Sequence, residues 1–308
     1  MGEKKKVLVV YYSQTGQMLR ILESVTSPLR KAGVELDFCP IVPEPDFPFP
    51  WPSDQFFDAF PESFIGIPCR IRPLDVNPAT EYDLIVVGYS PWYLSPSIPI
   101  HSFLQSDQAK ALLKGKKVVT IIGCRNMWIQ SQEKMKRYFK SLEAELVGNM
   151  ALRDKAGNLT SVLTIIRWVI KGQKEKSRFL PASGVSDADI ASAATFGELI
   201  NEAMASERYD DLQNKLIVHG AVLVKPNLVL FERNGSKIFK MFSRKILKKG
   251  PYGDPRRKNA RRLFKYYLLF VLFVVSPVGS GVYFFIKPFI LKKIRQDRAY
   301  FSQNALID

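Results

Sequence analysis

The chain has 308 residues, of which 46% are hydrophobic and 12% aromatic, enough to bury a large core and to exclude an intrinsically disordered protein. Three cysteines without a CxxC pair and two histidines exclude the common zinc sites and indicate no disulfide framework. The net charge of +16 is concentrated near the end: between Gly235 and Tyr300 there are 17 Lys and Arg residues and two acidic residues, which leaves about +1 for the remainder. Because these basic residues bracket an apolar run, the pattern favours anionic lipid over nucleic acid as a partner.

The first apolar segment, Val7–Tyr12, contains only apolar and aromatic side chains, which predicts a strand buried on both faces of a parallel sheet. Residues 1–6 before it lack the pattern of a signal peptide, so we expect the first half of the chain to be cytoplasmic. The strand runs into the loop Ser13–Gln17 and then into a helical pattern from Met18 to about Lys31. The chain therefore opens with a strand, a short loop and a helix.

This loop has the composition of an anion site. The first N–H groups of a helix have no partner within the helix and point at whatever lies above the loop. Ser13 and Thr15 add hydroxyl donors, and Gly16 allows the backbone to approach a phosphate closely. The loop resembles the phosphate loop of flavodoxins, Ser/Thr-x-Thr-Gly-x-Thr, which wraps the phosphate of FMN, although Met18 stands in place of the last Thr. The alternative is an ordinary turn with a good N-cap.

Apolar strands, loops and amphipathic helices recur along the chain, which predicts an α/β fold with a doubly wound parallel sheet. Pro40–Pro78 is rich in proline and aromatic residues, which favours an ordered insertion that lines or covers something apolar; a loop packed over the sheet edge is the alternative. Leu159–Ile170 is too short to span a bilayer and predicts a packed or interfacial helix. Further strands are expected at Val34–Cys39, Tyr82–Tyr89, Lys117–Gly123, Leu146–Leu152 and Val222–Val224. Further helices are expected near His101, at about Ile129–Glu145, from Ser186 to about Ser206 and from Tyr209 to about His219.

Ligands of doubly wound sheets lie beyond the carboxyl ends of the strands, where we expect the loops Ser13–Gln17, Ser90–Leu94 and Gly123–Trp128 to meet. The second loop carries two large flat side chains able to stack on the isoalloxazine ring of a flavin, and the third carries N–H and amide groups able to reach its polar edge. The alternative for Trp92 and Tyr93 is that they pack in the protein without a ligand. Arg125 could assist an anionic flavin or substrate or form a surface salt bridge, and Cys124 could be a redox thiol or a small buried side chain that fills space. No Ser-His-Asp or Cys-His constellation is visible, so the reactive group would belong to a cofactor. The predicted cofactor-binding residues are Ser13, Gln14, Thr15, Gly16, Gln17, Pro91, Trp92, Tyr93, Gly123 and Asn126, with no catalytic base assigned and no metal.

Tyr266–Ile286 contains no charged residue and has about the length of a membrane helix. Basic residues on both sides conflict with a simple positive-inside orientation. Because Pro277, Gly279 and Gly281 lie at its midpoint, we favour a re-entrant or in-plane hairpin with both ends cytoplasmic over a single span. In either case we expect attachment to the cytoplasmic side of the inner membrane by the C-terminal segment.

Several motifs together resemble the flavodoxin-like protein of bacterial dialkylresorcinol and aryl-polyene pathways, over essentially the whole chain. They are VVYYSQTGQ, FPFPW, FFDAFPESF, GYSPWYLSPSIPI, GCRNMW and RAYFS. The resemblance implies an FMN-dependent oxidoreductase (an aromatase) that oxidises a lipophilic dialkyl-cyclohexanedione to a dialkylresorcinol, beside a ketosynthase-type condensing enzyme. Some members are labelled condensing enzymes, a role we reject because the chain lacks a Cys-His dyad. The alternatives are a membrane-anchored flavodoxin-type electron carrier and a flavin-free pathway scaffold.

The expected organisation is a flavodoxin-like, FMN-binding domain over residues 1–207 with an insertion at 40–80. A basic connecting segment follows at 208–255, and a membrane-anchoring segment occupies 256–308.

Overall fold

The computed structural model describes residues 4–77 and 79–306. Residues 1–3, on which the expectation about the N-terminus partly rests, Pro78 at the end of the insertion, and residues 307–308 of the last segment lie outside the described residues.

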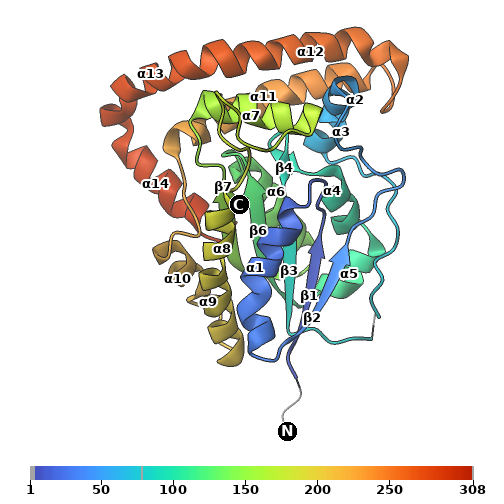
Figure 1. Cartoon of the computed structure of the whole chain (residues 1–308), viewed down its shortest axis with the longest axis vertical. Coiled ribbons are helices and arrows are strands. Elements are labelled where there is room, and N and C mark those ends of the chain that lie inside the picture. The colour runs from blue at the N-terminus through green and yellow to red at the C-terminus, as the bar shows by residue number, and fades with distance from the viewer. Residues whose placement is uncertain (1–3, 78, 307–308) are drawn as a thin grey trace.

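Five parallel strands form the central sheet in the order β2-β1-β3-β6-β7 (Figure 1). This is the 2-1-3-4-5 order of flavodoxin-like doubly wound sheets, with a reversal of winding between β1 and β3. Five of the six predicted strands are confirmed, with ends shifted by at most two residues. Runs such as Val7–Val10 are fully buried, as a central parallel strand requires. The strands are β1 Lys6–Tyr11, β2 Glu35–Pro40, β3 Leu84–Tyr89, β6 Lys117–Cys124 and β7 Glu145–Arg153.

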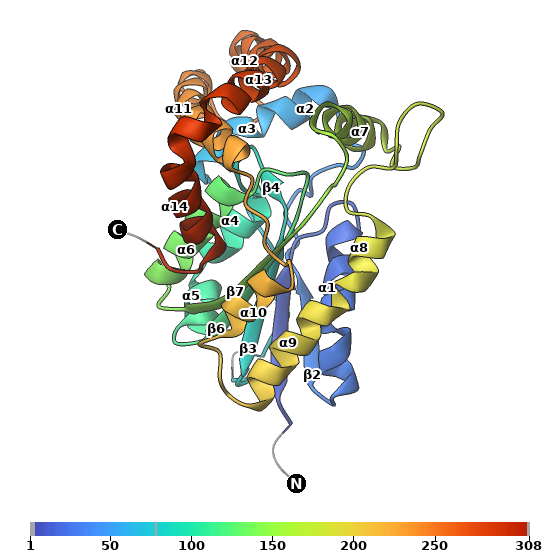
Figure 2. The same cartoon turned by 90° about the vertical axis from the view of Figure 1, so that its left-hand side faces the viewer.

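Helices cover both faces of the sheet (Figure 2). The predicted helix at 186–206 is divided at Ala193 into α8 and α9, and α9 packs closely on α1. Gly197 permits this contact, since a Cβ there would lie 1.8 Å from the carbonyl oxygen of Val25. One face carries α1 Gln17–Lys31, α8 Asp187–Ser192 and α9 Ala194–Ala205, and the other carries α4 Ile98–Leu104, α5 Asp107–Leu113 and α6 Ile129–Ser141.

The proline-rich insertion is ordered, as predicted. It contains two short helices, α2 Ser53–Asp58 and α3 Phe60–Ile65, and an antiparallel bridge between Pro43 and Ile71. Both helices lie near the carboxyl end of the sheet rather than along its edge (Figure 1).

Two regions differ from the sequence-based expectation. Val222–Val224 forms no strand; Ala221 instead accepts one hydrogen bond from the N–H of Ala151 on β7, and the chain passes through Pro226 into a long helix, α11 Pro226–Leu247. Most of the expected connecting segment is therefore helical, and it also contains α10 Leu212–Val218. Leu212 and Val229 belong to the same apolar core as the sheet. The domain boundary at residue 207 remains a prediction.

The C-terminal segment forms an outer layer with α11 and α7 Asn158–Lys171 (Figures 1 and 2). The hairpin bend expected at residues 277–281 is not formed, because the helix continues through these residues. A π-helical turn just before Pro277, in which the Ser276 N–H donates to the Val271 carbonyl, accommodates the missing N–H of the proline. The chain turns only at η3, after which α14 returns along the body (Figure 1). The segments are η1 Pro255–Arg257, α12 Lys258–Phe270, η2 Val271–Val275, α13 Ser276–Ile286, η3 Lys287–Ile290 and α14 Leu291–Ser302.

Candidate functional site

A cavity of about 510 Å³ lies between the carboxyl end of the sheet and the outer layer. This volume is within the range of small-molecule and cofactor sites. The loops that follow β1, β3 and β6 all contribute to its lining, as predicted. Eight of the ten predicted cofactor-binding residues line it: Ser13, Gln14, Thr15, Gln17, Pro91, Trp92, Tyr93 and Gly123.

The loop between β1 and α1 forms the polar end of the cavity. Gly16 has a left-handed φ of 78°, which turns the chain into the helix, and α1 has no acidic residue in its first turn. Among the described residues, the backbone N–H groups of residues 14–18 and the Thr15 hydroxyl have no hydrogen-bond acceptor. Ser13 Oγ accepts from the Leu19 N–H at 3.3 Å. Free donors at a helix N-terminus are the arrangement that binds a phosphate, so this loop fits the phosphate of a nucleotide.

Two predicted residues lie outside the lining of this cavity. Gly16 lines an adjacent cavity of about 240 Å³ together with Tyr12 and Ser13. Asn126 is buried, and its Nδ2 donates to Asn158 Oδ1 at 3.0 Å. Gln17 lines the large cavity, but its side-chain amide exchanges two hydrogen bonds of 3.1 Å with the backbone of Val185.

The loop after β3 is a tight hairpin between β4 Pro91–Trp92 and β5 Ser95–Pro96. Both turn residues, Tyr93 and Leu94, have positive φ (51° and 62°), as a two-residue hairpin turn requires. Non-glycine residues adopt this conformation at a cost of about 1–2 kcal/mol each, and such strain is typical of functional loops. The turn directs Trp92, Tyr93 and Leu94 to the cavity, where Trp92 contacts Trp51 of the insertion with ring centroids 4.8 Å apart.

The loop after β6 contributes polar groups with altered acidity. Burial lowers the pKa of Arg125 to about 10, and its guanidinium donates to the Asn158 carbonyl and side chain and to Ser161 Oγ. It therefore anchors the start of α7 rather than forming a surface salt bridge. Burial also raises the pKa of Cys124 to about 12, so this residue is a neutral thiol at physiological pH.

A Ser-His pairing that we did not recognise in the sequence lies behind the hairpin. His101 Nε2 is 2.8 Å from Ser95 Oγ, and Nδ1 is 2.9 Å from the Tyr138 hydroxyl. Ser95 and His101 are 0% and 1% exposed, and desolvation, with the nearby Lys134 charge, lowers the His101 pKa to about 3. Because neither side chain is accessible to a substrate, the pair stabilises the hairpin and does not form a hydrolytic site.

The apolar end of the cavity was not predicted residue by residue. Trp168 and Ile166 of α7 and Leu268 and Leu272 of the C-terminal helix line it, so that helix forms part of the roof. The signals available in the sequence were the short apolar stretch at 159–170 and the uncharged run at 266–286. Neither indicates which side faces a ligand. The insertion adds Trp51, Ser53, Phe56 and Phe57.

The described residues therefore define a flavodoxin-like α/β protein with a covered cavity and a long apolar C-terminal helix. Within the described residues one helix, Pro255–Ser302 of 48 residues, is long and apolar enough to cross a membrane by length and composition.

The chain is similar to a flavoprotein from Lactobacillus acidophilus NCFM in complex with FMN, with 22% identity over 48% of this chain and 93% of that chain and a TM-score of 0.39. It is also similar to an archaeal flavodoxin, with 13% identity over 65% of this chain and 99% of that chain and a TM-score of 0.38. A third similar structure is a flavone reductase, with 11% identity over 71% of this chain and 66% of that chain and a TM-score of 0.36. No family model and no curated protein matches the chain. The resemblance to the dialkylresorcinol proteins stays a prediction.

Proposed function

We propose that this protein is an FMN-dependent oxidoreductase that acts on a lipophilic ring substrate at a membrane. The observation that carries the proposal is the cavity: one end presents unpaired N–H groups at the start of α1, and the other is closed by apolar side chains of α7 and the C-terminal helix. An anionic cofactor and an oily substrate are the ligands that match these two ends.

The residues that would hold the cofactor follow from the lining. The N–H groups of residues 14–18 and the Thr15 hydroxyl would bind the phosphate, while Trp92 and Tyr93 would flank the ring system. When bound, FMN would supply an acceptor for a hydride. The protein's own contribution is to orient the two ligands and to exclude water with the insertion and the outer layer.

The finer proposal, supported by the family resemblance, is aromatisation of a dialkyl-cyclohexane-1,3-dione to a dialkylresorcinol. The ring would lose two hydrogen atoms, one as a hydride that bound FMN would accept and the other as a proton to a base. A separate oxidant would have to remove the two electrons before the next turnover. The predicted ketosynthase-type partner would supply the dione.

The rival function is that of an electron carrier. A carrier exposes the flavin edge to partner proteins, whereas Trp51, Phe56 and the C-terminal helix cover this cavity. The described geometry therefore favours a small-molecule substrate.

The test is to purify the full chain in detergent, record its absorption spectrum and titrate it with FMN. We expect a yellow chromophore and, in the absence of oxygen, one resorcinol formed per flavin reduced when a dialkyl-cyclohexanedione is added. The matched variant is Thr15→Glu, which places a carboxylate among the phosphate donors and should abolish both signals. A colourless protein that does not bind FMN would overturn the proposal, and flavin binding without turnover of the dione would favour the carrier.

A further inference from the structure

The C-terminal helix has two different faces. Its inner face carries Phe264, which is fully buried and stacks on Phe60 of α3 with ring centroids 3.6 Å apart, and Ser276, whose Oγ accepts from Asn158 Nδ2 at 3.0 Å. Its outer face is an uninterrupted line of exposed apolar side chains, the outer stripe, in which Val278 is 64% and Phe289 is 88% exposed. The outer stripe consists of Leu263, Tyr266, Phe270, Val274, Val278, Val282, Phe285 and Phe289.

The spacing of three or four residues keeps the outer stripe on one side of the helix. From Leu263 to Phe285 it extends about 33 Å at 1.5 Å per residue, and Phe289 follows in the turn at η3. An exposed apolar surface of this length marks an interaction site rather than ordinary surface.

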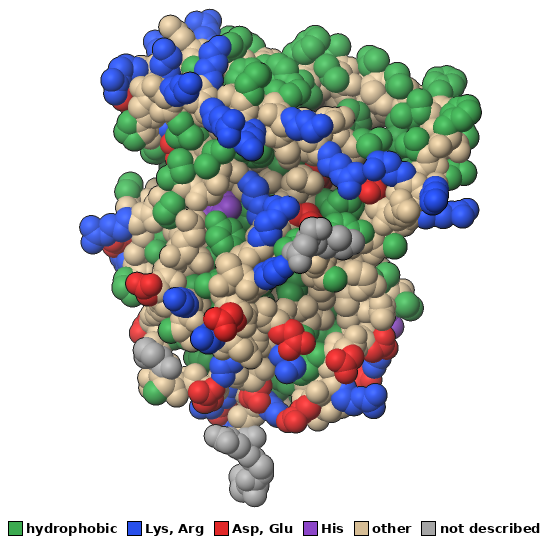
Figure 3. All heavy atoms as spheres, turned by 180° about the vertical axis from the view of Figure 1, so that it is seen from behind, with side chains coloured by type: hydrophobic (Ala, Val, Ile, Leu, Met, Phe, Trp, Pro, Cys, Tyr) green, Lys and Arg blue, Asp and Glu red, His purple; other side chains and the backbone are tan. Residues whose placement is uncertain are grey.

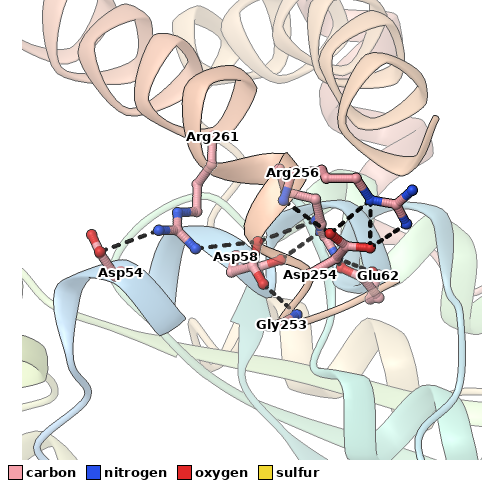
Figure 4. A network of polar contacts seen from close by, with 8 residues as sticks. Asp54, Asp58, Glu62, Gly253, Asp254, Arg256 and Arg261 are labelled. Carbon is pink, nitrogen blue, oxygen red and sulfur yellow. Dashed lines mark hydrogen bonds and ion pairs between the residues drawn. The ribbon is translucent and has the colours of Figure 1, made fainter. Parts of the chain in front are cut away.

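The beginning of the helix is held against the body by buried charges (Figure 4). Arg257 is fully buried; its guanidinium donates to both carboxylate oxygens of Glu62 (2.8 and 3.0 Å) and forms an ion pair with Asp58 at 3.2 Å. One turn later, Arg261 pairs with Asp54 and Asp58. These contacts fix the start of α12 on the insertion.

The end of the C-terminal segment is also held against the body. Phe301 of α14 is part of the apolar core of the sheet, and the Tyr300 hydroxyl donates to Glu133 of α6 at 2.7 Å. Asp297 pairs with Arg233 of α11 at 3.1 Å. Both ends of the apolar helix are therefore attached to one body, on the same side of the outer stripe.

Basic side chains surround the outer stripe. Figure 3 shows hydrophobic side chains gathered over the outer layer, with Lys and Arg side chains beside and below them. Cationic side chains at the edge of an apolar surface match the anionic head groups of a bilayer. The exposed basic residues before the stripe are Arg256, Lys258 and Arg262, and those after it are Lys287 in η3 and Lys292, Lys293, Arg295 and Arg298 of α14.

We propose that the helix does not cross the membrane but lies flat on an anionic bilayer, with the outer stripe immersed and both ends on the cytoplasmic side. A crossing helix would place one of its two attached ends on the opposite side and would break either the Arg257 or the Phe301 contacts. A flat helix keeps every described contact of its inner face and buries the outer stripe in the acyl boundary.

This orientation has a consequence that rests on the proposed function. The inner face, through Leu268 and Leu272, lines the cavity, while the outer stripe on the same helix lies in lipid. Helix α7, which packs against η2 of the C-terminal helix, adds the exposed apolar residues Leu163 and Ile166. The cavity would then face the bilayer, and a substrate dissolved in the membrane would enter without crossing water.

The experiment measures how deeply three positions of the C-terminal segment lie in the bilayer. A cysteine is introduced at Tyr266, Val278 or Phe289 in the full chain and labelled with an environment-sensitive fluorophore, and the unmutated chain, labelled in parallel, gives the background from native cysteines. Each protein is bound to vesicles of phosphatidylcholine and phosphatidylglycerol that contain lipids brominated at shallow or deep acyl positions. Glu198→Cys on α9 is the control on the far side of the body and should not be quenched.

A flat helix predicts equal, shallow quenching at all three positions, lost when phosphatidylglycerol is omitted or when Lys292 and Lys293 are both changed to Glu. A crossing helix predicts that Val278 lies about 18 Å deeper than Tyr266, because 12 residues separate them along the axis. That result would overturn the proposal. Absence of quenching at all three positions would also overturn it, and light scattering would then show whether the outer stripe instead joins two copies of the chain in a dimer. The measurement needs no flavin, so its failure is distinct from failure of the proposed function.

Discussion

The two ends of the cavity are built in different ways. The polar end is a local structure, in which one short loop between β1 and α1 supplies the free N–H groups by itself. The apolar end is assembled from segments about 100 residues apart: the insertion, α7 and the C-terminal helix. The polar end should therefore respond to single substitutions in the loop with a loss of cofactor alone. The apolar end should depend on the contacts that hold the layers together.

The largest expected effect is at the junction of these layers. Arg257→Ala leaves the buried Glu62 without its bidentate partner and should lower the free energy of unfolding by about 3–5 kcal/mol. Urea unfolding in detergent measures this. Arg256→Ala is the control, because that side chain pairs with Asp254 at the surface and should have little effect. A similar small loss in both variants would show that the Arg257 contacts do not hold the helix.

A second substitution tests the polar end alone. Thr15→Ala removes a hydroxyl donor to the charged phosphate, which should cost about 1.5–3 kcal/mol, roughly a 10- to 100-fold increase in the Kd for FMN. Fluorescence titration measures the Kd. Thr195 of α9 donates its hydroxyl to the Ser192 carbonyl of α8, outside the cofactor loop, so the control Thr195→Ala should leave the affinity for FMN unchanged. An unchanged Kd in Thr15→Ala would remove this hydroxyl from the site.

A third substitution tests the apolar end alone. Leu272→Trp fills part of the cavity from the roof and should reduce kcat/KM for the dione about 10-fold or more, with the Kd for FMN unchanged. Leu263→Trp on the outer stripe is the matched control and should leave kcat/KM as in the wild type. Loss of FMN binding in Leu272→Trp would mean that the two ends are not separate.

The last prediction concerns Glu232 of α11, which joins the outer layer to the body by accepting the Gln130 N–H at 2.7 Å. Burial raises its pKa from 4.5 to about 7. Between these values the folded protein binds a proton that the unfolded chain has released, so Glu232 lowers stability as pH rises from about 4.5 to about 7 and has a constant effect above that.

Glu232→Gln should remove this contribution. The difference in free energy of unfolding between the two proteins should therefore grow in favour of the variant through the window and level off above it. Chemical denaturation at a series of pH values measures the difference, and a difference that does not vary with pH would show that Glu232 is ionised when folded.

What the sequence by itself determined was local. Apolar runs such as Val7–Val10 predicted buried parallel strands because a two-sided sheet leaves no polar positions, and the residues after β1 predicted the anion site because a helix start always has free N–H groups. The proline and aromatic content of the insertion likewise predicted order.

What only the tertiary structure decided depends on contacts between distant segments. Pro277 suggested a bend, but the helix continues through the π-turn at 271–275, and Asn158 of α7 donates a hydrogen bond to Ser276 beside the proline. The Arg257 and Glu62 pair joins residues 195 positions apart, and neither residue signals the other in the sequence. Composition reports how apolar a segment is, whereas the partner that buries each face is set by the whole fold. For that reason the roof of the cavity and the outer stripe could be found only in three dimensions.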